Sequence, residues 1–303
     1  MIRLFTIIIK IILAMVSLVL SIIIWPLSYL DNHFKQEDSY SINDVRNIIC
    51  EEKYIMHAGG YIDGTDGEER TYTNSVESFE KCIENKRRII EVDFQLTSDN
   101  KWVCGHEGSA FGYWNLYIPS KKPLTYEEFI SCKNEMHLTA MTLSDVIQYM
   151  KKYEDVFIIT DTKDGNIQFC KTIKEIVPEM SGRFIIQIYH EKEYDDIKRL
   201  GFNNIIYTLY KTDGEERTDE RLSDFVDSHK LVGVTMPVEC VENVEKIGED
   251  VIVENEKNPH INYEMLINKD VPIYVHTVNN EVLIIKCRKK GVSGFYTDLF
   301  TDI

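Results

Sequence analysis

The chain is short of positive charge and lacks the cysteine pairs that mark common redox and zinc motifs. Its 34 lysines and arginines are outnumbered by 50 aspartates and glutamates, so the formal net charge is −16. A polyanion would be repelled by such a protein, and no stretch combines basic with aromatic residues, so nucleic acid is not expected as a substrate or partner. The seven cysteines are scattered and never spaced as Cys-x-x-Cys. This favours ordinary buried thiols over a disulfide framework.

Residues 11–30 contain no charged side chain at all. A helix rises 1.5 Å per residue, so a segment of this length covers about 30 Å, the hydrocarbon thickness of a bilayer. Arg3 and Lys10 precede the segment. The positive-inside rule then predicts a single-pass anchor in the cell membrane, with the rest of the chain on the extracytoplasmic side. A cleaved signal peptide is the alternative, but the apolar run is long and ends without an Ala-x-Ala site.

The sequence after the anchor predicts one α/β domain. Residues 1–30 form the expected anchor, and residues 31–50 are polar, as in a stalk with a lead-in helix. Residues 51–303 alternate strand-like and helix-like runs over about 250 residues, which is typical of a (β/α)8 TIM barrel. Eight strands are expected, at residues 54–57, 89–95, 102–106, 156–160, 184–189, 204–210, 231–236 and 273–278.

Helical patterns lie between most of these strands, at residues 75–85, 143–152, 167–176, 193–200, 219–228, 241–247 and 281–289. Two longer connections break the alternation, residues 61–73 and the insertion 107–141. Both leave the C-terminal ends of expected strands, where barrel enzymes bind their substrates.

Charged side chains follow or end several of the expected strands. Glu91 and Asp93 share one face of a strand because side chains alternate, and Asp161 ends another strand. Burying unpaired carboxylates is costly, and a divalent cation would remove that cost. Carboxylates suit Mg²⁺ or Ca²⁺. His57 and His106 end two further strands, and histidine, which titrates near neutrality, suits an acid–base pair.

The order of these motifs resembles the glycerophosphodiester phosphodiesterase family. In that family a strand ends in His-Arg-Gly and a helix begins with Asn-Thr. Glu-x-Asp, a strand-terminal His, Glu-x-Lys and Thr-Val-Asn follow, before an ending of Gly-Val-x-Gly and Thr-Asp. The corresponding segments of this chain are His57-Ala58-Gly59, Asn74-Ser75, Glu91-Val92-Asp93, His106, Asp161-Thr162-Lys163, Thr277-Val278-Asn279, Gly291-Val292-Ser293-Gly294 and Thr297-Asp298.

The resemblance implies a metal-dependent phosphodiester hydrolase. Its substrate would be a glycerophosphodiester, or a lipid or surface polymer that contains glycerol phosphate. One divalent cation, an acid–base pair and three substrate contacts are implied. The cation ligands would be Glu91, Asp93 and Asp161, and the acid–base pair would be His57 and His106. The substrate contacts would be Lys163, Asn74 and His276.

The chain departs from the family pattern in ways that leave two alternatives open. Ala58 stands where the family has a phosphate-binding Arg, a role that Arg70 could take over, and Asp161 is one methylene shorter than the family's Glu. His276 replaces an aromatic residue. The run Asp161-Thr162-Lys163-Asp164-Gly165, together with Ala58, also resembles sphingomyelinase D-like phospholipases. The second alternative is a membrane-anchored binding barrel with weak catalysis.

Overall fold

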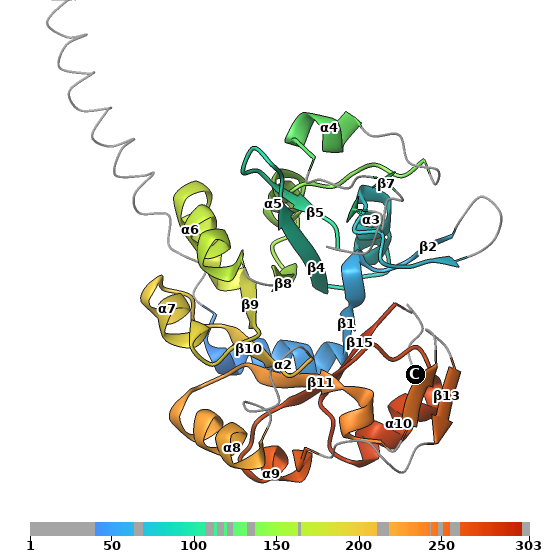
Figure 1. The fold of residues 1–303 in the computed structure, drawn as a ribbon, viewed down its shortest axis with the longest axis vertical. Helices are drawn as coiled ribbons and strands as arrows, with labels where there is room; N and C mark the ends of the chain where they lie inside the picture. The colour runs from blue at the N-terminus through green and yellow to red at the C-terminus, as the bar shows by residue number, and fades with distance from the viewer. Residues whose placement is uncertain are drawn as a thin grey trace, which may run out of the picture. The chain divides into compact units, whose positions relative to one another are not determined.

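The computed structural model describes residues 40–63, 69–106, 112–113, 118–119, 124–131, 137–162, 165–210, 218–242, 244–247, 251–254 and 261–298 (Figure 1). They belong to the unit Tyr40–Ile303. The anchor expected at residues 11–30 lies outside the described residues, and so does the stalk up to residue 39. In the part of the chain that the structure describes, no helix combines the length and apolar character needed to cross a bilayer.

Eight parallel strands close into a barrel, as the sequence predicts. β1 (Tyr54–Met56) pairs on one side with β4 (Ile89–Leu96) and on the other with β15 (Gly294–Thr297), which closes the sheet on itself. Figure 1 shows the strands arranged around a common centre with the helices outside. From β4 round to β15 the order is β8 (Phe157–Asp161), β9 (Phe184–Ile188), β10 (Ile205–Thr208), β11 (Gly233–Pro237) and β14 (Ile273–His276).

Amphipathic helices cover the outside of this barrel. Each buries one face against the outward-facing strand residues, and the large buried cluster between the two layers includes five cysteines. Several helices start at a capping box, such as that of Ser75 and Ser78, which satisfies the first free backbone N–H groups. The helices are α3 (Val76–Glu84), α5 (Leu143–Lys152), α6 (Asn166–Ile176), α7 (Glu193–Arg199), α8 (Asp219–Ser228), α9 (Tyr263–Asn268) and α10 (Glu281–Lys289).

A further helix, α2 (Ile42–Glu52), closes the N-terminal end of the barrel. Its buried residues Val45 and Ile49 belong to a cluster with inward-facing residues from the starts of the strands, such as Ile89 and Phe157. The bottom of the barrel is therefore apolar and filled. Polar inward-facing side chains gather at the C-terminal ends of the strands, and this confines a functional site to that face.

One expected barrel strand lies outside the barrel. β5 (Trp102–Cys104) pairs antiparallel with β4 and does not enter the ring. A tight turn from Thr97 to Lys101 joins the two strands, and a short turn permits only antiparallel pairing. The eighth barrel strand is β15, which the strand prediction omits. It has the sequence Gly-Phe-Tyr-Thr, so its apolar run consists of Phe295 and Tyr296 alone.

The helix expected at residues 241–247 is also wrong. A strand, β12 (Val244–Ile247), occupies most of that segment and pairs antiparallel with β13 (Val251–Glu254). β-Branched residues are frequent in both segments, and they pack better on a pleated strand than on a helix. The two long connections contain short elements, β2 (Ile62–Asp63) and β3 (Glu69–Arg70) in the first and β6 (Gly112–Tyr113), β7 (Ile118–Pro119) and α4 (Tyr126–Ser131) in the second.

Candidate active site

The C-terminal ends of the barrel strands surround a cavity of about 260 Å³. Most of the residues that the sequence singles out line it. Asn74 lies behind this lining and contacts Asp93. Lys163 lies outside the described residues. The predicted residues on the cavity wall are His57, Glu91, Asp93, His106, Asp161 and His276.

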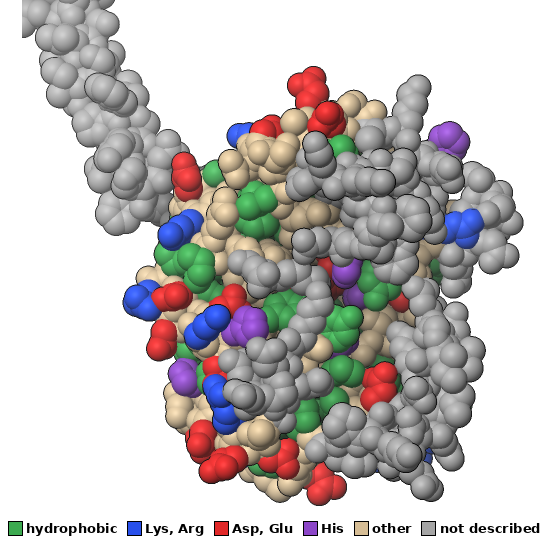
Figure 2. Space-filling model, in the orientation of Figure 1, with side chains coloured by type: hydrophobic (Ala, Val, Ile, Leu, Met, Phe, Trp, Pro, Cys, Tyr) green, Lys and Arg blue, Asp and Glu red, His purple; other side chains and the backbone are tan. Residues whose placement is uncertain are grey.

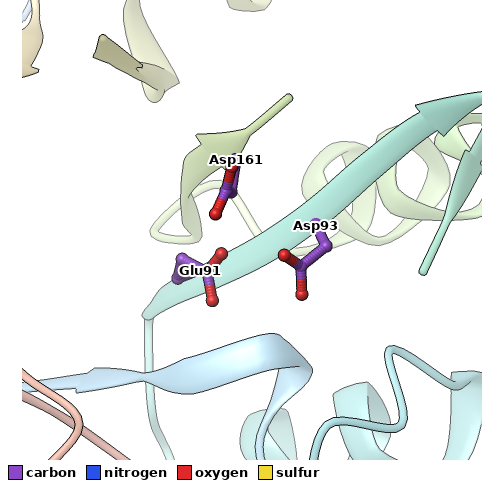
Figure 3. Close-up of side chains that lie close together, drawn as sticks. All are labelled: Glu91, Asp93 and Asp161. Atoms are coloured by element: carbon purple, nitrogen blue, oxygen red, sulfur yellow. The ribbon is translucent and has the colours of Figure 1, made fainter. Parts of the chain in front are cut away.

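Three carboxylates converge at one side of the cavity (Figure 3). Glu91 and Asp93 project from the same face of β4, and Asp161, at the end of β8, pairs in register with Asp93. One oxygen from each residue lies within 4.8 Å of those of the other two. The residues expose only 3%, 3% and 8% of their surface. The sequence places them on one edge of the sheet, and the structure shows them within reach of a single ion.

The electrostatics of this group favour a bound cation. Burial raises the pKa of Glu91, and the neighbouring charges of Asp93 and Asp161 raise it further, to about 8. His57 and the N–H of Ala58 act in the opposite direction but do not offset these effects. Three buried carboxylate oxygens form the hard donor set that Mg²⁺ and Ca²⁺ prefer, so the residues fit the divalent ion that the family resemblance implies.

Each carboxylate is held in place by a hydrogen bond from a neighbouring residue. Ala58 N donates to Glu91 Oε2 at 2.7 Å, and Tyr189 Oη donates to Asp161 Oδ2 at 2.8 Å. Asn74 makes two bonds with Asp93: its Nδ2 donates to Oδ2 at 2.9 Å, and its Oδ1 accepts from the Asp93 N–H at 3.1 Å. Partners of this kind orient metal ligands. Tyr189 is absent from the sequence prediction, although it ends an expected strand.

The turn after β1 explains how the backbone reaches Glu91. Ala58, Gly59 and Gly60 all have positive φ angles, of 47°, 77° and 87°. This conformation turns the Ala58 N–H toward the carboxylate while the Ala58 side chain is fully buried. A Cβ on Gly59 would lie 3.3 Å from the Ser78 Oγ, so glycine permits the close approach of the turn to α3.

His57 is paired with an acidic residue that the sequence prediction does not include among the site residues. Its Nδ1 lies 3.1 Å from Oδ1 of Asp298, the residue that directly follows β15. Asn279 Nδ2 donates to Asp298 Oδ2 at 2.7 Å and fixes the carboxylate. Burial lowers the pKa of His57, but the hydrogen bond and charge of Asp298, with the charges of Glu91 and Asp93, outweigh it and raise the pKa to about 9. Asn279 and Asp298 both belong to the family-like motifs.

The second histidine reaches the same cavity from the end of β5. The ring of Tyr72 contacts both histidines, with its centroid 4.3 Å from that of His57 and 6.0 Å from that of His106. Tyr72 itself has a positive φ of 56° and lines the cavity. The first long connection therefore contributes an aromatic side chain that contacts both members of the expected acid–base pair.

Rings and one further carboxylate form the rest of the wall. His276 contacts Tyr210 and Tyr296, at centroid distances of 5.4 and 6.1 Å. Glu239 also lines the cavity. The described lining contains no lysine or arginine, and Arg70 is not part of it. On the face drawn in Figure 2, acidic and basic side chains are scattered over the top, left and lower parts, with histidine and hydrophobic side chains near the centre.

Solved structures share this fold. A glycerophosphoryl diester phosphodiesterase from Parabacteroides distasonis is 17% identical, with a TM-score of 0.56, covering 87% of this chain and 90% of that one. The glycerophosphodiester phosphodiesterase from Thermotoga maritima is 18% identical, with a TM-score of 0.57 and coverages of 82% and 95%. A phosphodiesterase from Oleispira antarctica, solved with the product sn-glycerol-3-phosphate, is 12% identical, with a TM-score of 0.56 and coverages of 81% and 92%.

The sequence itself also matches a family model. The model describes the glycerophosphoryl diester phosphodiesterase family and matches residues 66–301. That segment covers most of the chain. It includes β4, which supplies Glu91 and Asp93, β8, which supplies Asp161, and β15, which Asp298 follows. The chain therefore belongs to the glycerophosphoryl diester phosphodiesterase family of phosphoric diester hydrolases.

Proposed function

We propose that the protein hydrolyses glycerophosphodiesters with one divalent cation, held by Glu91, Asp93 and Asp161, and with His57 and His106 as the acid–base pair. The observation that carries this proposal is the buried group of three carboxylates beside the His57–Asp298 pair. A structural relative was solved with the product sn-glycerol-3-phosphate, which supports a substrate of this class.

A bound cation would supply Lewis-acid stabilisation of the charge that develops on the phosphate oxygens. The protein's own residues supply the proton transfers. Because the Nδ1–H of His57 points at Asp298, its Nε2 is the atom available to the substrate. The raised pKa of His57 keeps a proton on Nε2 near neutral pH, so we assign His57 to protonating the leaving alkoxide and His106 to deprotonating the nucleophile.

The missing arginine leaves the phosphate dependent on fewer positive groups. The buried side chain of Ala58 offers it no contact. The cation, protonated His57 and Lys163 remain as sources of positive charge, and we propose Lys163 as a phosphate contact from its place two residues after Asp161 in the sequence. We propose Asn74 as the residue that positions Asp93, because both ends of its amide are bonded to it.

The substrate is tested by a hydrolysis panel in the presence of Mg²⁺ or Ca²⁺. The panel contains glycerophosphocholine, lysophosphatidylcholine and a polymer of glycerol phosphate. We expect release of glycerol 3-phosphate and the free alcohol from glycerophosphocholine. Release of choline from lysophosphatidylcholine in place of this reaction would support the sphingomyelinase D-like alternative, and cleavage of the polymer alone would assign a surface polymer. Binding without turnover of any of the three would contradict the proposal.

Cation binding is expected to release a proton. Glu91 must be ionised to act as a ligand, and with its pKa at about 8 it is mostly protonated at about pH 7 before the cation binds. Calorimetric titration of Mg²⁺ in buffers with different ionisation enthalpies should show close to one proton released per cation near pH 7. The number should fall toward zero above about pH 9. Binding with no proton release across this range would contradict the assignment of Glu91.

We also propose that residues 11–30 anchor the protein in the cell membrane with the barrel on the extracytoplasmic side. The support is the uncharged length of the segment and the basic residues before it. The protein is then expected to sediment with membranes and to resist alkaline extraction. Protease added to cells with a permeable outer envelope should degrade the barrel. A soluble product that begins near residue 31 would contradict the anchor.

A further inference from the structure

The wall of the cavity that faces the three carboxylates has its own chemistry. In the barrel order β4-β8-β9-β10-β11-β14-β15-β1, strand β11 stands four places from β4 in either direction. Glu239 follows β11 in a short 3₁₀ helix, Val238–Cys240. The strands on either side of β11 lead to Tyr210 and His276. These residues therefore stand across the mouth of the barrel from Glu91 and Asp93.

Glu239 is a half-buried carboxylate on this wall. Within the described residues, no ion pair or side-chain hydrogen bond involves its carboxylate, unlike those of the acidic triad and Asp298. A carboxylate held at a cavity wall with no cationic partner attracts positive charge. Glu239 therefore differs from the residues expected to hold the metal both in its position and in its lack of side-chain hydrogen bonds within the described residues.

The overall charge of the cavity favours a substrate with a positive group. Its described lining carries four carboxylates and no lysine or arginine. One divalent cation at the triad and the protonated His57 compensate three of these charges. A phosphodiester brings another negative charge of its own. A positive group on the same substrate molecule, placed across the cavity beside Glu239, would reduce the repulsion that a purely anionic substrate meets.

The rings next to Glu239 fit an ammonium group. Tyr210, 53% exposed at the rim, lies nearly perpendicular to the ring of His276. Tyr296 also lines the cavity, is only 3% exposed, and has its ring centroid 6.1 Å from that of His276. Tyrosine faces attract ammonium groups, and aromatic cages with a carboxylate are a recurrent way to bind quaternary ammonium.

We propose that Glu239, Tyr210, His276 and Tyr296 form a subsite for the ammonium group of the alcohol esterified to the phosphate, so that the protein selects diesters of amino alcohols such as choline. This inference rests on the proposed phosphodiesterase function for its substrate, but the subsite can be tested without turnover. It fits the absence of lysine and arginine from the described lining, since a zwitterionic diester needs less cationic compensation than a diester whose alcohol is uncharged.

The test compares choline with its uncharged isostere, in which a tert-butyl group replaces the trimethylammonium. Both are titrated against the full chain saturated with Mg²⁺, which keeps the triad from competing for the ammonium, and dissociation constants are measured by ligand-observed NMR. We expect choline to bind about tenfold more tightly than the isostere. Glu239→Gln and Tyr210→Leu should each bring this ratio close to one. Glu264→Gln, the same charge change on an exposed face of α9, should leave the ratio unchanged.

A turnover measurement separates this inference from the proposed function. In the wild type, kcat/KM for glycerophosphocholine should exceed that for glycerophosphoglycerol, and Glu239→Gln should lower the ratio about tenfold. Equal binding of choline and the isostere, or a binding ratio that Glu239→Gln does not change, would overturn the subsite. If choline is bound preferentially and neither diester is cleaved, the subsite stands and the proposed reaction is wrong.

Discussion

Replacing His57 with glutamine is expected to lower phosphodiester turnover by roughly 100-fold or more, the usual scale of a lost acid–base group. The folded structure should remain, since His57 is at the end of β1 and not part of the large apolar clusters. His106→Gln should have an effect of the same size. The matched control is His137→Gln, which changes an exposed histidine outside the cavity. Wild-type rates in folded His57→Gln and His106→Gln proteins would remove the acid–base assignment.

Asp298 gives this prediction a readout that a purely structural role would not produce. As the acid, His57 must be protonated, so activity falls as the pH rises through its pKa. Asp298 raises that pKa. Asp298→Asn should therefore move the alkaline limb of the kcat/KM profile to lower pH, besides lowering its maximum. An unchanged alkaline limb would show that Asp298 does not act through His57.

Replacing Asp93 with asparagine is expected to weaken divalent-cation binding by more than about 100-fold. Residues that merely orient ligands are worth about 10–100-fold in metal affinity, so loss of a ligand charge should cost more. Asp93 lies among three carboxylates that are nearly inaccessible to solvent, and the Asn74 amide already fixes its orientation. Asp155→Asn is the control, because Asp155 makes an exposed ion pair with Arg88 and such pairs contribute little. Calorimetry of the two variants measures the difference.

The site was predictable from sequence where it depends on local rules. Alternation along one strand places Glu91 and Asp93 on the same face, and strand ends of a parallel barrel meet at one edge, which brings Asp161 to them. The barrel itself followed from the alternation of strands and helices. These inferences need no knowledge of which distant segments pair.

The parts of the fold and of the site that the sequence does not predict depend on contacts between distant segments. The pairing of His57 with Asp298 joins residues 241 positions apart, and it exists because β1 and β15 are neighbours in the closed ring. The strand prediction omits β15 and counts β5 in its place, so it does not reveal that β1 and β15 close the barrel. The bond from Tyr189 to Asp161 likewise crosses between two strands. Pattern and spacing describe single elements, whereas these contacts require the register of neighbouring elements.

The central claim is that the carboxylate group holds a cation required for hydrolysis, and activity after chelation tests it most directly. The protein is treated with a chelator, freed of it, and assayed with glycerophosphocholine while Mg²⁺ or Ca²⁺ is added back. Turnover should be lost on chelation and return with a midpoint equal to the calorimetric dissociation constant, and in Asp93→Asn the midpoint should rise with the weakened affinity. Full activity in the chelated protein, or an unchanged midpoint in Asp93→Asn, would contradict the account.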